Sequence, residues 1–255
     1  SNERNPYILS LKSFEKDKTE EIEPNNTEQT SMDITPESTR KGYIIPGDDR
    51  DYYHIVYPEE RGYCFTIKAE TLSNVDINFT LINKLTGSEK LINRYGWGGS
   101  EELPFVSSAK GDYYIRVAGA VNRTNIKDPL YYIKIEEKVA EKNAGFEMEF
   151  NDTLETATEL INLEEVDGVI SQDDADFFRF NVINETESVN ISVSRFTGDI
   201  IAEVFDSAGV KIDSFSGDKT LERLSAGTYY IKLTKSDTLS SFYRLFLNIR
   251  YGQEQ

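Results

Sequence analysis

The stretch GDDRDYYHI, residues 47–55, places Asp48, Asp49 and Asp51 directly before a run of aromatic and β-branched residues. Apolar and polar residues alternate in that run, which predicts a β-strand with one buried face. Carboxylates this close together repel one another unless a cation lies among them. A counterpart, QDDADFFRF, occupies residues 172–180. A feature that occurs twice at matching places requires a physical explanation.

Other segments repeat in the same order as this pair. EIEPNNT (21–27) corresponds to EMEFNDT (147–153), GDYYIRV (111–117) to GTYYIKL (227–233), and PLYYIKIEE (129–137), more loosely, to SFYRLFLNI (241–249). We interpret the chain as a tandem duplication of one unit. The polar stretch around residues 137–146 predicts the boundary between the units. The expected organisation is a linker or arm over residues 1–20, a first domain over 21–138 and a second over 139–255.

Strand patterns dominate both halves of the chain. They recur at a spacing of roughly 8–12 residues and are separated by clusters of Gly, Asn, Asp and Ser, as in antiparallel sandwiches and jelly rolls. The one helix-like segment, 153–163, is short. We therefore predict an all-β fold of two tandem antiparallel β-sandwich domains, jelly-roll-like in character. The expected strands are 41–46, 51–57, 63–70, 75–83, 89–95, 101–107, 112–119 and 129–137, then 166–170, 176–182, 188–195, 199–206, 211–216, 220–224, 228–234 and 242–249.

Composition limits the classes of partner. With 28 Lys and Arg against 45 Asp and Glu among 255 residues, the formal net charge is −17, which disfavours nucleic acid and suits a protein that gathers cations. A single cysteine, Cys64, excludes an intrachain disulfide. We find no apolar run of about 18 residues, so no membrane span is predicted. The polar start of the chain is expected to be that of a mature fragment without a signal peptide.

The acidic segments predict a metal site in each half. Each half opens with Glu-x-Glu-x-Asn-[Asn/Asp]-Thr and carries Asp-x-x-Asp further on, so one intervening strand can bring the two together. Such a set offers only oxygen atoms, which suits Ca²⁺, whereas Zn²⁺ prefers His or Cys. The alternative is that these are solvated acidic loops. We expect one Ca²⁺ per domain, held by Glu21, Glu23, Asn25, Asn26, Asp48 and Asp51 in the first and by Glu147, Glu149, Asn151, Asp152, Asp173 and Asp176 in the second.

The order of motifs resembles a known family. E-x-E-x-N-[ND]-T, a glycine-bearing strand, D-x-x-D-[YF]-[YF] and G-x-Y-Y-I-x-[VL] resemble the bacterial pre-peptidase C-terminal domain, which includes the collagen-binding domains of clostridial collagenases. The resemblance covers residues 21–138 and 145–250. It implies β-sandwich domains attached to secreted proteases, with Ca²⁺ bound by the acidic segments just named. Asn26 replaces the carboxylate of Asp152, so a weaker first site is expected. Ligands vary within the family, so the fold does not bring the ligand with it.

The residues needed for common hydrolytic mechanisms are missing. His54 is the single histidine, and alternation places it with Tyr52 and Val56 on the outer face of its strand, where the second half has Arg179. Cys64 has no cysteine counterpart and is expected to be a half-buried small side chain. A pair of carboxylates can hydrolyse glycosides, but nothing in the sequence distinguishes an acid from a base. We predict a non-enzymatic protein.

Two sets of aromatic residues are candidates for ligand contact. Trp97 lies in a glycine-rich loop, where it either stacks on a sugar or proline ring or fills the end of a sandwich. The pairs Tyr113–Tyr114 and Tyr229–Tyr230 each place one ring in the core, which leaves Tyr114 and Tyr230 as candidates for a flat binding face.

The sequence therefore favours a non-catalytic, calcium-binding module of an exported bacterial protein, secreted or at the cell surface. We expect it to hold that protein, or a linked protease, against an extracellular polymer such as collagen or a polysaccharide. The alternatives are a structural spacer or secretion-related segment with no ligand beyond the ion, and a surface adhesin. An exposed aromatic patch on one sheet favours the first interpretation over a spacer. The oligomeric state is not predicted.

Overall fold

The computed structural model describes residues 19–44, 49–57, 63–71, 75–108, 111–119, 129–139, 145–171, 173–194 and 199–252. These ranges contain strands and a single turn of 3₁₀ helix, η1 (Glu28–Thr30). The predicted all-β class is confirmed. No helix in the part of the chain that the structure describes is long and apolar enough to cross a bilayer.

The first half folds as a sandwich of two sheets. One sheet has the order β1-β3-β8-β5-β6 and the other the order β2-β9-β4-β7. Its strands are β1 (Met32–Asp33), β2 (Thr39–Tyr43), β3 (Arg50–Tyr57), β4 (Tyr63–Thr71), β5 (Ile77–Asn83), β6 (Glu89–Ile92), β7 (Glu101–Ser108), β8 (Gly111–Gly119) and β9 (Leu130–Val139).

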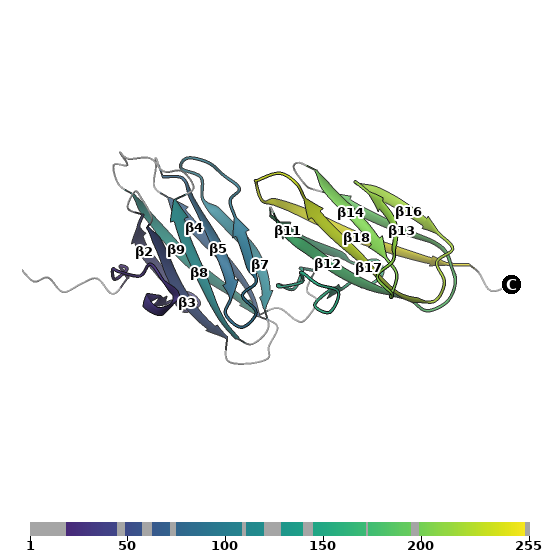
Figure 1. Cartoon of the computed structure of the whole chain (residues 1–255), viewed down its shortest axis with the longest axis horizontal. Coiled ribbons are helices and arrows are strands. Elements are labelled where there is room, and N and C mark those ends of the chain that lie inside the picture. The colour runs from purple at the N-terminus through teal and green to yellow at the C-terminus, as the bar shows by residue number, and fades with distance from the viewer. Residues whose placement is uncertain are drawn as a thin grey trace, which may run out of the picture.

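The second half repeats this arrangement. Its sheets have the orders β10-β12-β17-β14-β15 and β11-β18-β13-β16, which match those of the first half strand for strand. Figure 1 shows the two sandwiches end to end along the long axis of the molecule. The strands are β10 (Thr158–Glu159), β11 (Glu165–Ile170), β12 (Ala175–Val182), β13 (Thr186–Ser194), β14 (Ile200–Phe205), β15 (Lys211–Phe215), β16 (Asp218–Glu222), β17 (Gly227–Lys235) and β18 (Ser241–Tyr251).

Every predicted strand corresponds to one of β2–β9 or β11–β18. The sequence analysis missed β1 and β10, which are two residues long and pair in parallel with β3 and β12. Such short strands show no periodicity. The segment 153–163 forms turns and β10 rather than a helix. The domain boundaries after residues 20 and 138, and the common origin of the halves, remain predictions.

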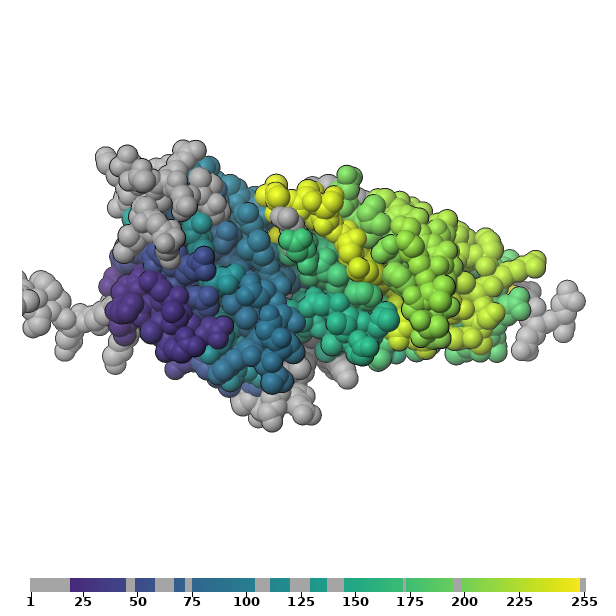
Figure 2. Space-filling model, in the orientation of Figure 1, coloured from purple at the N-terminus to yellow at the C-terminus, as the bar shows by residue number. Residues whose placement is uncertain are grey.

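Alternation along the strands builds a separate core in each sandwich. In β3, Tyr53, Ile55 and Tyr57 are buried, whereas Tyr52, His54 and Val56 lie on the outer face, as predicted. The two cores meet where the sandwiches touch, because Val169 belongs to the first apolar cluster and Phe150 and Phe242 pack against it. Figure 2 shows this contact as a continuous surface between the two halves.

A glycine and a tyrosine face each other at one edge of each sandwich. Gly42 of the edge strand β2 is paired with Tyr131 of β9, and Gly168 of β11 is paired with Tyr243 of β18. A Cβ atom on either glycine would lie 2.3 Å from the tyrosine Cζ atom. Glycine therefore allows the ring to lie across the edge strand, which directs the tyrosine hydroxyl group toward the opening segment of the same sandwich.

Replacing either glycine should destabilise the protein. We expect Gly42→Ala and Gly168→Ala each to lower the free energy of unfolding by about 1–3 kcal/mol, because the new methyl group overlaps a buried ring. Gly96→Ala is the control, since a Cβ atom there meets nothing within 4 Å. Urea denaturation measures the difference, and a wild-type midpoint for Gly42→Ala would contradict the packing described.

Candidate functional site

Backbone hydrogen bonds place the opening segment of the first sandwich beside β3. Glu21 N donates to Lys41 O at 2.9 Å, and Tyr52 N donates to Asn25 O at 2.9 Å. These bonds join the segment to β2 on one side and to β3 on the other. Its acidic side chains are thereby brought next to Asp51, near the start of β3.

The first cluster consists of Glu21, Glu23 and Asp51, each with a carboxylate oxygen within 4.8 Å of the others. The Asn25 side chain completes it: one terminal amide atom lies 3.0 Å from Asp51 Oδ1 and 3.1 Å from Glu23 Oε2. With nitrogen at that position the amide donates to both carboxylates. With oxygen there, the oxygens of three residues converge, which is the arrangement that a hard cation requires. Glu21, Asn25 and Asp51 are buried, and Glu23 is exposed.

Two tyrosines cover the buried side of the first cluster. Tyr131 Oη donates to Asp51 Oδ2 at 2.6 Å and lies 2.7 Å from Tyr53 Oη. The backbone N–H of Tyr43 donates to Glu21 Oε1 at 2.6 Å. These donors orient the carboxylates, but they are neutral and leave the negative charge of the cluster in place.

The electrostatics of the first cluster favour a bound cation. Burial, together with the nearby charge of Glu21, raises the pKa of Asp51 to about 9. Burial also raises the pKa of Glu21. A cation among these oxygens would stabilise the ionised carboxylates and reverse both shifts. The residues present therefore fit a hard divalent ion, with Glu21, Glu23, Asn25 and Asp51 as the side chains able to hold it.

Asn26 and Asp48 are the remaining predicted ligands of the first site. One terminal amide atom of Asn26 lies 3.0 Å from Asp49 Oδ1 and 3.1 Å from Arg50 O, so this side chain is turned toward Asp49. Asn26 is exposed and does not contribute to the first cluster. Asp48 lies outside the described residues.

The second sandwich uses the same framework. Glu147 N donates to Asp167 O at 3.0 Å, and Phe177 N donates to Asn151 O at 2.8 Å. Glu147, Glu149 and Asp176 again place carboxylate oxygens within 4.8 Å of one another, and all three are buried. The two halves therefore build equivalent acidic clusters from equivalent residues.

The donors to the second cluster also match those of the first. Val169 N donates to Glu147 Oε1 at 2.7 Å, as Tyr43 N does to Glu21. Tyr243 Oη donates to Glu147 Oε2 at 2.5 Å from the position equivalent to Tyr131.

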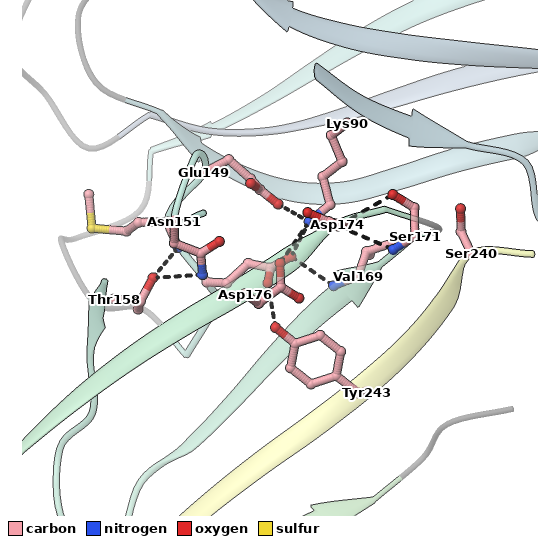
Figure 3. A network of polar contacts seen from close by, with 12 residues as sticks. Lys90, Glu149, Asn151, Thr158, Val169, Ser171, Asp174, Asp176, Ser240 and Tyr243 are labelled. Atoms are coloured by element: carbon pink, nitrogen blue, oxygen red, sulfur yellow. Dashed lines mark hydrogen bonds and ion pairs between the residues drawn. The ribbon is translucent and has the colours of Figure 1, made fainter. Parts of the chain in front are cut away.

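A lysine from the first sandwich occupies the second cluster. The side chain of Lys90, on β6, is 1% exposed, and its Nζ atom forms an ion pair with Glu149. The same nitrogen lies 3.1 Å from Asp174 Oδ2, 3.3 Å from Glu147 Oε1 and 3.4 Å from Asp176 Oδ1. Figure 3 shows the ammonium group directed into the group of carboxylates. Four acidic side chains thus surround one cation that the protein itself supplies.

The charge of Lys90 is maintained by its surroundings. Burial lowers the pKa of Lys90, but the charges of Asp174 and Asp176 outweigh that effect, so the pKa is raised well above its ordinary value. Burial raises the pKa values of Glu149 and Asp176, although Lys90 opposes both shifts.

The other predicted ligands of the second site lie at different depths. Asn151 is fully buried, and its Oδ1 atom has no hydrogen-bond partner among the described residues. Asp152 is half-buried, and burial followed by the charge of Asp174 raises its pKa. Asp173 is exposed, with a left-handed φ of 61°, and its neighbour Asp174 makes the contact with Lys90 instead.

Sequence reasoning missed Lys90, Asp174, Tyr131 and Tyr243. The run Asp173–Asp174 offers two candidates, and the turn that points Asp173 outward selects the second. The tyrosines are marked only by the glycines that face them across the sheet. No pattern links Lys90 to residues in the other half, because their contact depends on how the two sandwiches pack.

The candidate ligand-contacting aromatics differ in exposure. Trp97 is 42% exposed and Tyr230 is half-buried. Tyr114 was expected on an exposed face, but it is only 6% exposed, so that expectation is wrong. The rings of His54 and Tyr114 lie 5.2 Å apart, and Lys84 Nζ lies 5.7 Å from the Tyr114 ring. These neighbours cover the tyrosine on the outer face of its sheet.

Comparisons with known proteins give structural likeness only. No protein-family model and no curated protein matches the chain. Among solved structures, the pre-peptidase C-terminal domain of a collagenase from Bacillus anthracis is 17% identical with a TM-score of 0.33, and the match covers 36% of this chain and 93% of that domain. A protein of Eubacterium rectale described as secreted is 9% identical with a TM-score of 0.30, over 89% of this chain and 81% of that one. An archaeal virus protein with a triple jelly-roll fold is 10% identical with a TM-score of 0.28, over 84% and 59% of the two chains. At these values the comparisons assign no family, ligand or activity.

The raised pKa of Asp51 predicts that the stability of the protein depends on pH when a chelator has removed divalent ions. Its folded pKa of about 9 lies above the ordinary 3.8, so protonation of Asp51 contributes stability that is complete below about pH 4 and is lost as the pH rises through about 9. Asp51→Asn cannot ionise and should be more stable than the wild type by about 1–3 kcal/mol at pH 9 in EDTA. Urea denaturation from pH 5 to pH 9 measures this, with the exposed Glu28→Gln as control. Parallel profiles for the wild type and Asp51→Asn would contradict it.

Proposed function

We propose that this protein is a non-catalytic, calcium-binding β-sandwich module of an exported bacterial protein. Its role is to hold that protein, or a linked protease, against an extracellular polymer such as collagen or a polysaccharide. The observation that carries the calcium assignment is the first cluster, where Glu21, Asp51 and the Asn25 amide are buried and converge with Glu23.

The chemistry of the first cluster supports Ca²⁺ in particular. All of its side-chain donors to a metal are oxygens, and carboxylates together with an amide oxygen are ligands typical of Ca²⁺. Glu23 is exposed and therefore leaves an approach from solvent. A bound ion would join the opening segment to β3, because Glu21 and Asp51 come from those two elements. This stiffening would reduce the entropy lost when the sandwich binds a partner.

The targeting role is supported by the exposed ring of Trp97 in a glycine-rich loop. A solvent-facing indole provides a flat apolar surface for a sugar or a proline ring. Tyr230 on the outer face of the second sandwich is a weaker candidate, since it is half-buried.

A rigid spacer is the alternative function, and one observation favours it. The two sandwiches touch through apolar side chains and through the buried Lys90, so the described part of the chain holds them at a fixed separation. A spacer or a secretion-related segment needs this rigidity and no polymer surface. A surface adhesin would need both.

Calcium should stabilise the protein through the first cluster. An ion that binds only the folded state adds about 2.7 kcal/mol at a concentration 100 times its Kd. We expect Ca²⁺ to raise the melting temperature of the chelator-treated wild type and to have much less effect on Asp51→Asn. Differential scanning calorimetry measures the shift, and Glu28→Gln, in the same acidic segment, should respond like the wild type. An equal response from Asp51→Asn would exclude this cluster as the site.

Polymer binding separates the targeting role from the spacer. The wild type should co-sediment with insoluble collagen or with a polysaccharide such as chitin, and Trp97→Ala should reduce the bound fraction several-fold. The wild type and Trp97→Ala should have the same melting temperature in Ca²⁺. If no polymer retains the wild type above an inert resin control, the spacer is the better account.

A further inference from the structure

Lys90 is not required by the sandwich that carries it. In the first half, β5 and β6 pair Phe79 with Ile92 and Leu81 with Lys90. In the second half, β14 and β15 pair Ala202 with Phe215 and Val204 with Asp213, which makes Asp213 the counterpart of Lys90. The same fold thus accepts an aspartate at this position, so the reason for a lysine lies elsewhere.

Hydrogen bonds between the halves hold the chain directly after Lys90, at the end of β6. Ser240 Oγ donates to Leu91 O at 3.1 Å and accepts from Asn93 N at 3.2 Å. Ser240 N donates to Asn93 O at 3.2 Å. Beyond them, the Arg94 guanidinium lies 3.7 Å from the centre of the Phe242 ring. These contacts fix the position of the chain beside Lys90, whose side chain extends into the second cluster.

The second cluster offers more oxygen ligands than one ammonium group can use. A lysine has three N–H donors, whereas Glu147, Glu149, Asp174 and Asp176 all lie around Nζ. Asp176 Oδ2 and Asn151 Oδ1 are buried and have no hydrogen-bond partner among the described residues. The second cluster thus offers as many oxygen ligands as a divalent cation would use, although it holds only the single positive charge of Lys90.

Among the described residues, the first cluster has no such internal cation in the ion pairs of Glu23 and Asp51. It shares the glutamates, the asparagine, the aspartate and the tyrosine hydroxyl of the second. Within the described ranges, however, no lysine or arginine forms an ion pair with Glu23 or Asp51. The equivalent clusters therefore differ in the source of their cation.

We propose that Lys90 is the resident cation of the second cluster, where it takes the place of a calcium ion and locks the two sandwiches together. The chain then binds a single Ca²⁺, in the first sandwich, rather than one per domain as the sequence suggested. The identity of the ion rests on the proposed function, whereas the lock rests on the contacts of Lys90 alone. The first sandwich is thus the partner recognised by the acidic cluster of the second.

The number of calcium ions and the docking of the sandwiches test this proposal. Lys90→Met keeps an unbranched side chain and removes the charge. By equilibrium dialysis of chelator-treated full-length chain, we expect a single Ca²⁺ in the wild type and a second in Lys90→Met. Adding Asp176→Asn to Lys90→Met should remove the second ion. In EDTA, small-angle scattering should give a larger radius of gyration for Lys90→Met than for the wild type.

Lys84→Met is the matched control, because Lys84 lies in the turn before β6 with its side chain 45% exposed. It should leave the ion count and the radius unchanged. The proposal is overturned if the wild type binds Ca²⁺ in both clusters, or if Lys90→Met gains neither an ion nor a larger radius. If the wild type binds no Ca²⁺, the proposed function fails, while a larger radius for Lys90→Met still supports the lock.

A measurement on the wild type covers the case in which Lys90→Met does not fold. Brief reductive methylation followed by peptide mass spectrometry should modify Lys84 and leave Lys90 protected, with and without Ca²⁺. Methylation of Lys90 at the rate of Lys84, or its exposure by Ca²⁺, would overturn the proposal.

Discussion

A carboxylate buried among other carboxylates needs a positive charge, and this constraint shapes both halves of the molecule. Each sandwich begins with an acidic segment and joins it to the start of a central strand, which leaves Asp51 and Asp176 fully buried. Neutral donors such as the hydroxyl groups of Tyr131 and Tyr243 orient the acids without cancelling their charge. Because an unpaired buried charge is costly, the arrangement needs either a cation beside the acids or a proton on one of them, and the raised pKa of Asp51 reflects the second case.

The two halves meet this requirement in different ways. The second cluster receives Lys90 from the neighbouring sandwich, so the same contact that neutralises the acids also joins the domains. The first cluster is open to solvent at Glu23 and suits an ion taken from solution. Removing one partner of a buried ion pair is strongly destabilising, by about 3–5 kcal/mol, which makes Lys90 a strong constraint on the interface. Under the proposed function, ion binding in the first sandwich and docking through the second are two uses of the same arrangement of acids.

The sequence predicted the fold better than it predicted the contents of the site. Alternation and turn residues located β2–β9 and β11–β18, because each strand has one buried face and its pattern is local. Glu21, Asp51, Glu147, Glu149 and Asp176 were found because their motifs repeat. Lys90 was not, since its partners belong to the other half and no local pattern records how two domains pack. Asp174 was passed over for Asp173 because a backbone turn, invisible in composition, decides which of them points inward.

The most direct test of this account is a crystal structure of the full chain grown with Ca²⁺ and examined by anomalous scattering at long wavelength. We predict an anomalous peak between Glu21, Glu23 and Asp51, and in the second cluster the Lys90 ammonium group without a peak. A peak among Glu147, Glu149 and Asp176 with Lys90 displaced, or no peak in the first cluster, would contradict the account.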